Sequence, residues 1–142
     1  MARVKYLVDT NIWLELLLNQ QKAEVVVRFL KILPTTEIAL SEFSLCSIGL
    51  ILTRLDKPDV WRDFVTDVLE QGALRRIALD PAGLREMMVV RQQFRLDFDD
   101  AYQYVAAQQH SLVLVSFDTD FDKTFLGRKS PEDILAIVTT SS

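Results

Sequence analysis

The sequence predicts an α/β fold, in which helices flank a central, mostly parallel sheet of about four or five strands. The first observation is that short apolar runs alternate along the chain with segments whose apolar residues recur every three or four positions. The second is composition, since the 142 residues are 49% hydrophobic and 25% charged, as in ordinary globular proteins. Four glycines and four prolines leave little material for a linker, so we expect one domain over residues 1–142.

The chain opens with a strand that passes directly into a helix. Residues 4–8 form a nearly continuous apolar run, which is typical of a buried strand, and helical spacing of apolar residues begins at Ile12. Residues 9–11 (Asp-Thr-Asn) therefore mark a junction between strand and helix. A second helix is predicted over 21–33, and Pro34 ends it because proline cannot continue a helix.

Two further helices and a strand follow. Ser41 is a good N-cap, and residues 43–55 are mostly apolar, so we expect a third helix that is buried on most of its sides. Pro58 suits the first position of a fourth helix, whose apolar stripe continues until Gly72 stops it. Residues 74–79 predict a strand.

The last third of the chain repeats this alternation. Helical periodicity predicts one helix over 81–95 and another over 101–108. Residues 112–115 are the clearest strand of the chain, and residues 134–138 predict a final one. Strands that alternate with helices in this way favour a parallel sheet covered on both faces.

The residue types present limit the chemistry. Cys46 is the only cysteine and His110 is the only histidine. These counts exclude a disulfide framework, a zinc site of cysteines and histidines, a metalloprotease with two zinc-binding histidines and a nuclease with two catalytic histidines. Acid–base or metal chemistry must therefore rest on carboxylates.

The charge distribution points to one acidic region. The net charge of −4 argues against a uniformly basic surface that coats nucleic acid. No apolar run approaches the roughly 20 residues that span a bilayer, and the start of the chain is unlike a signal peptide, so we expect a soluble, cytoplasmic protein with no membrane partner. Residues 96–122 contain no Lys or Arg and six aspartates, namely Asp97, Asp99, Asp100, Asp118, Asp120 and Asp122.

Several carboxylates are expected to meet at one edge of the sheet. Ligands of open parallel sheets bind beyond the carboxyl ends of the strands, and Asp9 and Asp118 follow two such ends. Glu42 and Asp100 lie at helix starts that can face the same crevice. Mg²⁺ and Mn²⁺ prefer oxygen ligands, and clustered carboxylates that bind them relieve their mutual repulsion. Such a site can activate water against a phosphodiester without any histidine.

Four short motifs occur in a fixed order at these places. They are residues 8–12 (V-D-T-N-I), 41–43 (S-E-F), 100–101 (D-A) and 116–121 (S-F-D-T-D-F). Together they resemble the four acidic motifs of the PIN-domain nucleases, and particularly of the VapC-type ribonuclease toxins of prokaryotic toxin–antitoxin modules. The match extends over nearly the whole chain, although Ser116 stands where the family more often has threonine.

The resemblance implies a metal-dependent endoribonuclease that cleaves single-stranded or structured RNA with a metal-activated water and serves as the toxin of a type II module. It implies Mg²⁺ or Mn²⁺ as the cofactor, a homodimer, and an antitoxin peptide that occupies the acidic groove. The implied catalytic and metal-binding core is Asp9, Glu42, Asp100 and Asp118, with Asp120 as a further metal ligand and Thr10, Asn11 and Ser116 as supporting residues.

Some assignments have alternatives. Asp97, Asp99 and Asp100 all lie near the third motif, and Asp100 is chosen because Ala101 follows it, whereas Asp97 suits an N-cap. Acidic residues in the first turn of a helix also stabilise the helix dipole without any further function. Asn11 is as well suited to capping a helix as to supporting the site.

Other functions match the sequence less well. A phosphatase of the haloacid dehalogenase type needs a second aspartate two positions after the first, where this chain has Asn11. A receiver domain needs an acidic pair after the first strand and a lysine after a late strand, and we find only Asp9. The main alternative is a non-catalytic PIN-like module that binds RNA or protein and holds a metal for structure alone.

Overall fold

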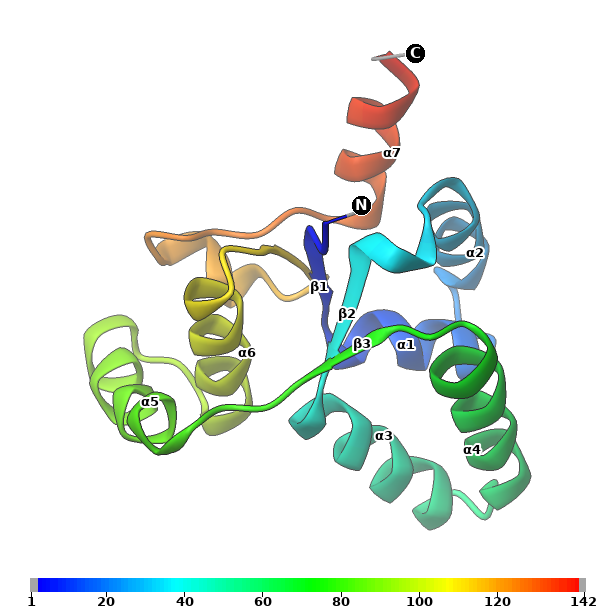
Figure 1. Cartoon of the computed structure of the whole chain (residues 1–142), viewed down its shortest axis with the longest axis horizontal. Helices are drawn as coiled ribbons and strands as arrows, with labels where there is room; N and C mark the ends of the chain where they lie inside the picture. The colour runs from blue at the N-terminus through cyan, green and yellow to red at the C-terminus, as the bar shows by residue number, and fades with distance from the viewer. Residues whose placement is uncertain (1–2, 141–142) are drawn as a thin grey trace.

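The computed structural model describes residues 3–140 and confirms the predicted fold class (Figure 1). Four short parallel strands form a sheet in the order β3-β2-β1-β4. In the middle of the sheet, Leu7 pairs with Ala39 on one side and with Leu114 on the other. The strands are β1 (Tyr6–Val8), β2 (Ile38–Ser41), β3 (Arg75–Ile77) and β4 (Val113–Val115).

Helices occupy the connections between strands, as crossovers between parallel strands require. Between residues 3 and 140 the α-helices are α1 (Thr10–Leu17), α2 (Ala23–Ile32), α3 (Glu42–Arg54), α4 (Pro58–Phe64), α5 (Pro81–Phe94), α6 (Phe98–Gln109) and α7 (Pro131–Thr140). Shorter helical segments are η1 (Thr35–Glu37), the π-helical η2 (Val65–Gln71) and η3 (Thr119–Lys123). None of the helices in this part of the chain is long and apolar enough to cross a membrane.

The alternation of side chains along the strands divides the core into two layers. Leu7 and Leu114 pack with residues of α5 and α6, whereas their neighbours Val8 and Val115 pack with residues of α1, α2, α3 and α7. Figure 1 shows α5 and α6 on one side of the sheet and α1, α2 and α4 on the other. All four side chains are completely buried, and each contributes about 1.5–3 kcal/mol of hydrophobic stabilisation.

The predicted strand at 134–138 is wrong, because these residues belong to α7. The amide of Ser130 donates to Asp133 Oδ2 at 2.9 Å and the amide of Asp133 donates to Ser130 Oγ at 3.1 Å, which is a reciprocal helix cap. Pro131 then occupies the first helical position. Ile134 and Leu135 are buried in the layer beneath α7, so the apolar run covers one face of a helix.

Two predicted helices differ from the structure in detail. The third helix, α3, is less buried than its composition predicts, because Leu50 is 51% exposed and Leu55, which ends it, is 50% exposed. The fourth predicted helix is α-helical only as far as Phe64 and continues as the π-helical η2 up to Gly72.

The topology brings three chain segments to one edge of the sheet. β2, β1 and β4 are parallel neighbours, so their carboxyl ends lie next to one another. Ser41 ends β2, Asp9 follows β1 and Ser116 follows β4. All three residues are at most 5% exposed. Polar groups from distant parts of the sequence therefore meet at this edge.

Candidate active site

The carboxylate of Asp9 is buried and held from both sides. The residue is only 5% exposed and caps α1. Asp9 Oδ1 accepts hydrogen bonds from the Thr10 amide at 2.8 Å and from Gln103 Nε2 at 2.9 Å. Asp9 Oδ2 accepts one from the Ser116 hydroxyl at 2.7 Å. Burial raises the pKa of Asp9 above its usual value, although the hydrogen bonds from Ser116 and Gln103 act in the opposite direction.

Gln103 links Asp9 to the start of α3. This glutamine lies on α6 and is 1% exposed. Its Nε2 also donates to Ser44 Oγ at 2.8 Å, and its Oε1 accepts from the Ser41 hydroxyl at 2.6 Å. Ser44 Oγ accepts a further hydrogen bond from Thr10 Oγ1 at 2.8 Å. Because both ends of the Gln103 amide have partners, its orientation is fixed, and it fixes the Asp9 carboxylate in turn.

Ser116 connects Asp9 to the turn after β4. Its hydroxyl accepts hydrogen bonds from the Asp118 amide at 2.9 Å and from Asn11 Nδ2 at 3.2 Å. Asn11 Oδ1 accepts one from the Phe117 amide at 3.3 Å. Asn11 therefore contacts the turn that carries Asp118, and the Asp9 side chain, not that of Asn11, accepts the helix-capping hydrogen bond.

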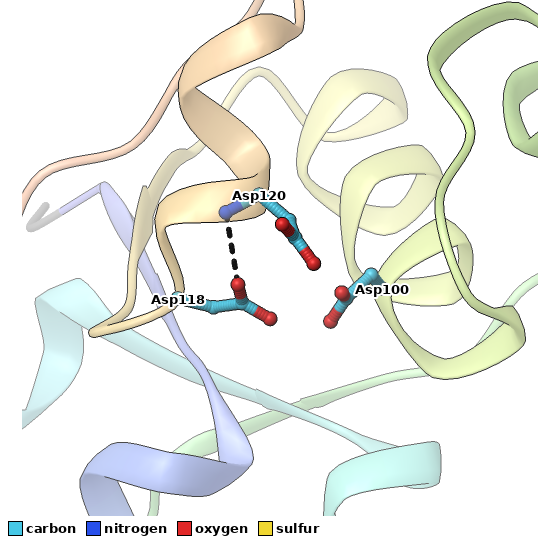
Figure 2. Close-up of side chains that lie close together, drawn as sticks. All are labelled: Asp100, Asp118 and Asp120. Atoms are coloured by element: carbon cyan, nitrogen blue, oxygen red, sulfur yellow. Dashed lines mark hydrogen bonds between the residues drawn. The ribbon is translucent and has the colours of Figure 1, made fainter.

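Three aspartate side chains converge across this edge. Carboxylate oxygens of Asp100, Asp118 and Asp120 all lie within 4.8 Å of one another. Figure 2 shows Asp100 on α6 pointing toward Asp118 and Asp120, which come from the segment after β4. Asp118 caps η3 and accepts a hydrogen bond from the Asp120 amide at 2.9 Å. This turn fixes the spacing of Asp118 and Asp120, and α6 supplies the opposing acid.

The proximity of these acids changes the protonation of Asp100. Burial, together with the neighbouring Asp118 carboxyl and the charge of Asp9, raises the pKa of Asp100 to about 8. Hard carboxylate oxygens that repel one another are the donor set that Mg²⁺ and Mn²⁺ prefer. The donor set therefore fits a divalent cation, and Asp100, Asp118 and Asp120 are the candidate ligands.

A cleft of about 250 Å³ opens beside the acids. Its lining offers carboxylates, two amides, two hydroxyls and two aliphatic side chains. The lining residues are Asp9, Thr10, Asn11, Leu14, Ser47, Ile51, Asp99, Asp100, Gln103 and Asp118. The predicted residues Asp9, Asp100 and Asp118 thus border one space, with Thr10 and Asn11 in its wall and Ser116 buried behind it.

Glu42 is the predicted site residue that the structure places elsewhere. It accepts hydrogen bonds from Arg76 Nε at 2.8 Å and from Arg76 Nη2 at 3.2 Å, and it does not line the cleft. The α3 residues that do line the cleft are Ser47 and Ile51. Five positions separate Glu42 from Ser47, which puts these two side chains about 140° apart around the helix axis. The acid at the start of α3 therefore faces β3, and the acidic cluster forms without it.

The structure also separates the aspartates around the third motif. Asp97 occupies the N-cap position of α6, as predicted, but its side chain makes no capping hydrogen bond, and it does not line the cleft. Asp99 and Asp100 both line the cleft, and only Asp100 is buried. Asp100 alone of these three joins Asp118 and Asp120.

The sequence analysis missed Gln103 and Ser44. Both side chains lie in the buried network around Asp9, and their partners are distant in sequence. A signal for Gln103 does exist. It is a polar residue among the apolar positions of α6 and stands three residues after Asp100, so both lie on one face of the helix.

Comparison with known proteins gives a family and a fold. A model of the PIN domain family matches residues 6–125. Among solved structures, FitAB bound to a DNA fragment has 24% identity and a TM-score of 0.77, covering 89% of this chain and 94% of its own. A toxin–antitoxin complex from Klebsiella pneumoniae has 20% identity and a TM-score of 0.71, with coverages of 89% and 98%. Mycobacterium tuberculosis VapC20, described as a sarcin-ricin loop cleaving toxin, has 18% identity and a TM-score of 0.72, with coverages of 86% and 96%.

At these identities the solved structures show that the fold is shared. No curated protein matches the sequence.

Proposed function

The chain belongs to the PIN domain family, and from this premise we propose that it is a metal-dependent endoribonuclease and the toxin of a type II toxin–antitoxin module. The observation that carries the proposal is the convergence of Asp100, Asp118 and Asp120 beside the buried Asp9. A purely structural role does not explain why four acids are held together at one sheet edge, because their mutual repulsion destabilises the metal-free fold.

Asp100, Asp118 and Asp120 would hold the cation, and Asp9 would lie beside it. Mg²⁺ or Mn²⁺ bound there would lower the pKa of a water molecule and neutralise charge on the phosphate that is attacked. Gln103, Ser116 and the Thr10 amide keep the Asp9 carboxylate in one orientation. Two aliphatic side chains, Leu14 and Ile51, line the cleft together with its polar groups.

RNA is the substrate that we favour. VapC20, which shares the fold, is described as cleaving the sarcin-ricin loop, a structured RNA. The cleft is open at the edge of the sheet, so a single-stranded segment or a loop can reach the acids.

Two protein partners belong to the same proposal. One solved structure with this fold is a toxin–antitoxin complex, which supports an antitoxin peptide as a partner. A homodimer is part of the proposal because the resemblance to VapC-type toxins implies one, and Leu50 of α3 and Leu55 just beyond that helix are half-exposed leucines that a second copy could cover.

A cleavage assay tests the function. We expect the wild-type protein to cut single-stranded RNA with Mg²⁺ or Mn²⁺ and to be inactive in a chelator. Asp118→Asn should abolish cleavage, whereas Asp63→Asn, an exposed aspartate on α4, should leave it unchanged. A protein whose melting temperature rises with Mn²⁺ but which cleaves no single-stranded or structured RNA would instead be a non-catalytic module with a structural metal.

A further inference from the structure

A second hollow lies next to the acidic cleft and has a different lining. It has a volume of about 550 Å³ and is formed by the end of α5 and the loop that leads to α6. Two arginines one helical step of four residues apart, Arg91 and Arg95, stand on the same face of this end. The lining residues are Met88, Arg91, Gln92, Arg95, Leu96 and Asp97.

The two guanidinium groups of this hollow are free of acidic partners. Both arginines are exposed, and neither takes part in any of the ion pairs found within residues 3–140. Asp97 is the single carboxylate among the lining residues and forms no ion pair with either arginine. By contrast, Arg76 and Arg128 are each neutralised by a carboxylate. The hollow is therefore a positive site on a chain of net charge −4.

A lysine from another element joins this corner. Arg95 ends α5 in the left-handed conformation, with φ 57° and ψ 48°, so that its carbonyl turns away from the helix. This carbonyl accepts a hydrogen bond from Lys123 Nζ at 3.2 Å. Lys123 belongs to η3, the turn that begins after Asp118 and contains Asp120. The contact ties the basic end of α5 to the segment that carries two of the acids.

The hollow and the acidic cleft adjoin each other. Asp97 lines the hollow, and Asp100, which lines the cleft, follows it by three residues on the same helix. Residues at this spacing are about 4.5 Å apart along a helix axis, a little less than one turn. Lys123 follows Asp120 by the same three positions in η3. The arginines at the end of α5 thus precede the acid of α6, and Lys123 follows the acids of the segment after β4.

We propose that Arg91 and Arg95, assisted by Lys123, form a phosphate-binding groove that holds the backbone of RNA beside the acidic cleft. A guanidinium group can donate two parallel hydrogen bonds to the oxygens of one phosphate. Contacts of this kind position a nucleic acid without reading its bases. The groove rests on the proposed function, because it describes how the substrate of that site is held. It also explains how an acidic protein binds an anionic polymer.

Binding without turnover tests the groove. The affinity of a labelled single-stranded RNA is measured by fluorescence anisotropy in EDTA, at several salt concentrations, for wild type and for the double variant Arg91→Gln/Arg95→Gln. We expect the double variant to bind at least about tenfold more weakly. The slope of log K against log salt should also fall by about 1.4, since each phosphate contact on a single strand contributes about 0.7.

Arg85→Gln is the matched control, because Arg85 is an exposed arginine on the same helix and does not line the hollow. It should bind RNA like wild type, and all variants should keep the wild-type melting temperature. If the double variant and the control have the same RNA affinity and the same salt slope, the proposed groove is wrong. It is also wrong if the wild-type protein binds no RNA. If the wild-type protein cleaves RNA and the double variant binds RNA normally, the groove proposal is wrong and the ribonuclease proposal stands. If RNA binding depends on the two arginines but the wild-type protein cleaves no RNA, the groove proposal is supported and the ribonuclease proposal is wrong.

Discussion

Ser116 Oγ lies 2.7 Å from Asp9 Oδ2 and donates a hydrogen bond to it, although the two residues are 107 positions apart in the sequence. The same hydroxyl accepts a hydrogen bond from the Asp118 amide. One buried serine therefore sets the distance between the acid after β1 and the acid after β4. Its hydroxyl also lowers the pKa of Asp9, against the effect of burial.

Ser116→Ala should weaken both the fold and the site. The substitution removes a donor to a buried carboxylate, which costs about 1.5–3 kcal/mol, and it raises the pKa of Asp9 further. We expect a lower melting temperature in chelator and weaker binding of Mn²⁺, measured by scanning calorimetry and by titration calorimetry. Ser116→Thr keeps the hydroxyl and should restore metal binding. Equal metal affinity in Ser116→Ala and wild type would show that Asp9 needs no such support.

Asp100→Asn should move function and stability in opposite directions. The substitution keeps the shape of the side chain but removes a carboxyl whose ionisation three neighbouring acids oppose. RNA cleavage should fall by orders of magnitude because metal ligation is weakened, while the melting temperature in chelator stays equal or rises slightly. Asp97→Asn is the matched control and should cleave RNA like wild type. An Asp100→Asn protein that is fully active would reopen the choice among Asp97, Asp99 and Asp100.

The residues that sequence reasoning placed well are those whose position follows from strand direction. Asp9 and Asp118 come shortly after β1 and β4, and neighbouring parallel strands end at the same edge. Asp100 lies in the first turn of the helix that leads into β4. For Asp9 and Asp118 the alternation of strands and helices was enough to predict this edge of the sheet, whereas Asp100 was chosen among three aspartates because Ala101 follows it, as in the third motif that the chain resembles.

The structure differs from the sequence reasoning where rotation about a helix axis or a distant partner decides the place of a side chain. Glu42 was chosen because it starts a helix and because residues 41–43 resemble the second acidic motif of the PIN-domain nucleases. In the structure its carboxylate pairs with Arg76 of β3, which the local pattern does not reveal. Gln103 has its partners 59 to 94 positions away. The apolar run at 134–138 is too short for its period to decide between strand and helix, and the cap formed by Ser130 and Asp133 decides it.

Gln103→Leu tests whether the buried amide positions Asp9. The substitution removes one hydrogen-bond partner from each of Asp9 Oδ1, Ser41 Oγ and Ser44 Oγ, so we expect a loss of about 2 kcal/mol or more in the free energy of unfolding. Metal affinity should fall as well, because the Asp9 carboxylate can turn away from the cleft. Gln108→Leu changes an exposed glutamine on the same helix and should alter neither quantity. Unchanged metal binding in a destabilised Gln103→Leu protein would make Gln103 a packing residue only.

The pKa of Asp100 gives a pH dependence with a definite sign. It is raised to about 8 in the folded protein, whereas an aspartate in an unfolded chain titrates near 3.9. The folded, metal-free protein therefore binds the proton more tightly, and the stability that this supplies is complete below about pH 4 and is lost as the pH rises toward about 8. Denaturant unfolding in chelator at several pH values should show this decline. The Asp100→Asn protein lacks this carboxyl, so its free energy of unfolding should fall less as the pH rises.

The same proton competes with the cation. Mn²⁺ affinity should increase as the pH rises toward about 8, and binding at neutral pH should release a proton from Asp100. Titration calorimetry in two buffers of different ionisation enthalpy measures this release. Metal affinity that is constant from about pH 6 to about pH 8 would contradict a protonated Asp100 in the metal-free site.

Glu42→Gln tests whether the acid at the start of α3 acts together with the cluster of Asp100, Asp118 and Asp120. Glu42 is 34% exposed and its partner Arg76 is 53% exposed, and ion pairs at such positions contribute about 0–1 kcal/mol. We therefore expect a small change in stability, with metal affinity and RNA cleavage equal to wild type, measured beside Asp118→Asn as the inactive reference. Arg76→Gln should behave in the same way, because it breaks the same pair from the other side. If Glu42→Gln instead lost cleavage while Arg76→Gln kept it, Glu42 would have to leave Arg76 and reach the cleft during the reaction. The acidic core would then contain Glu42 together with Asp9, Asp100 and Asp118.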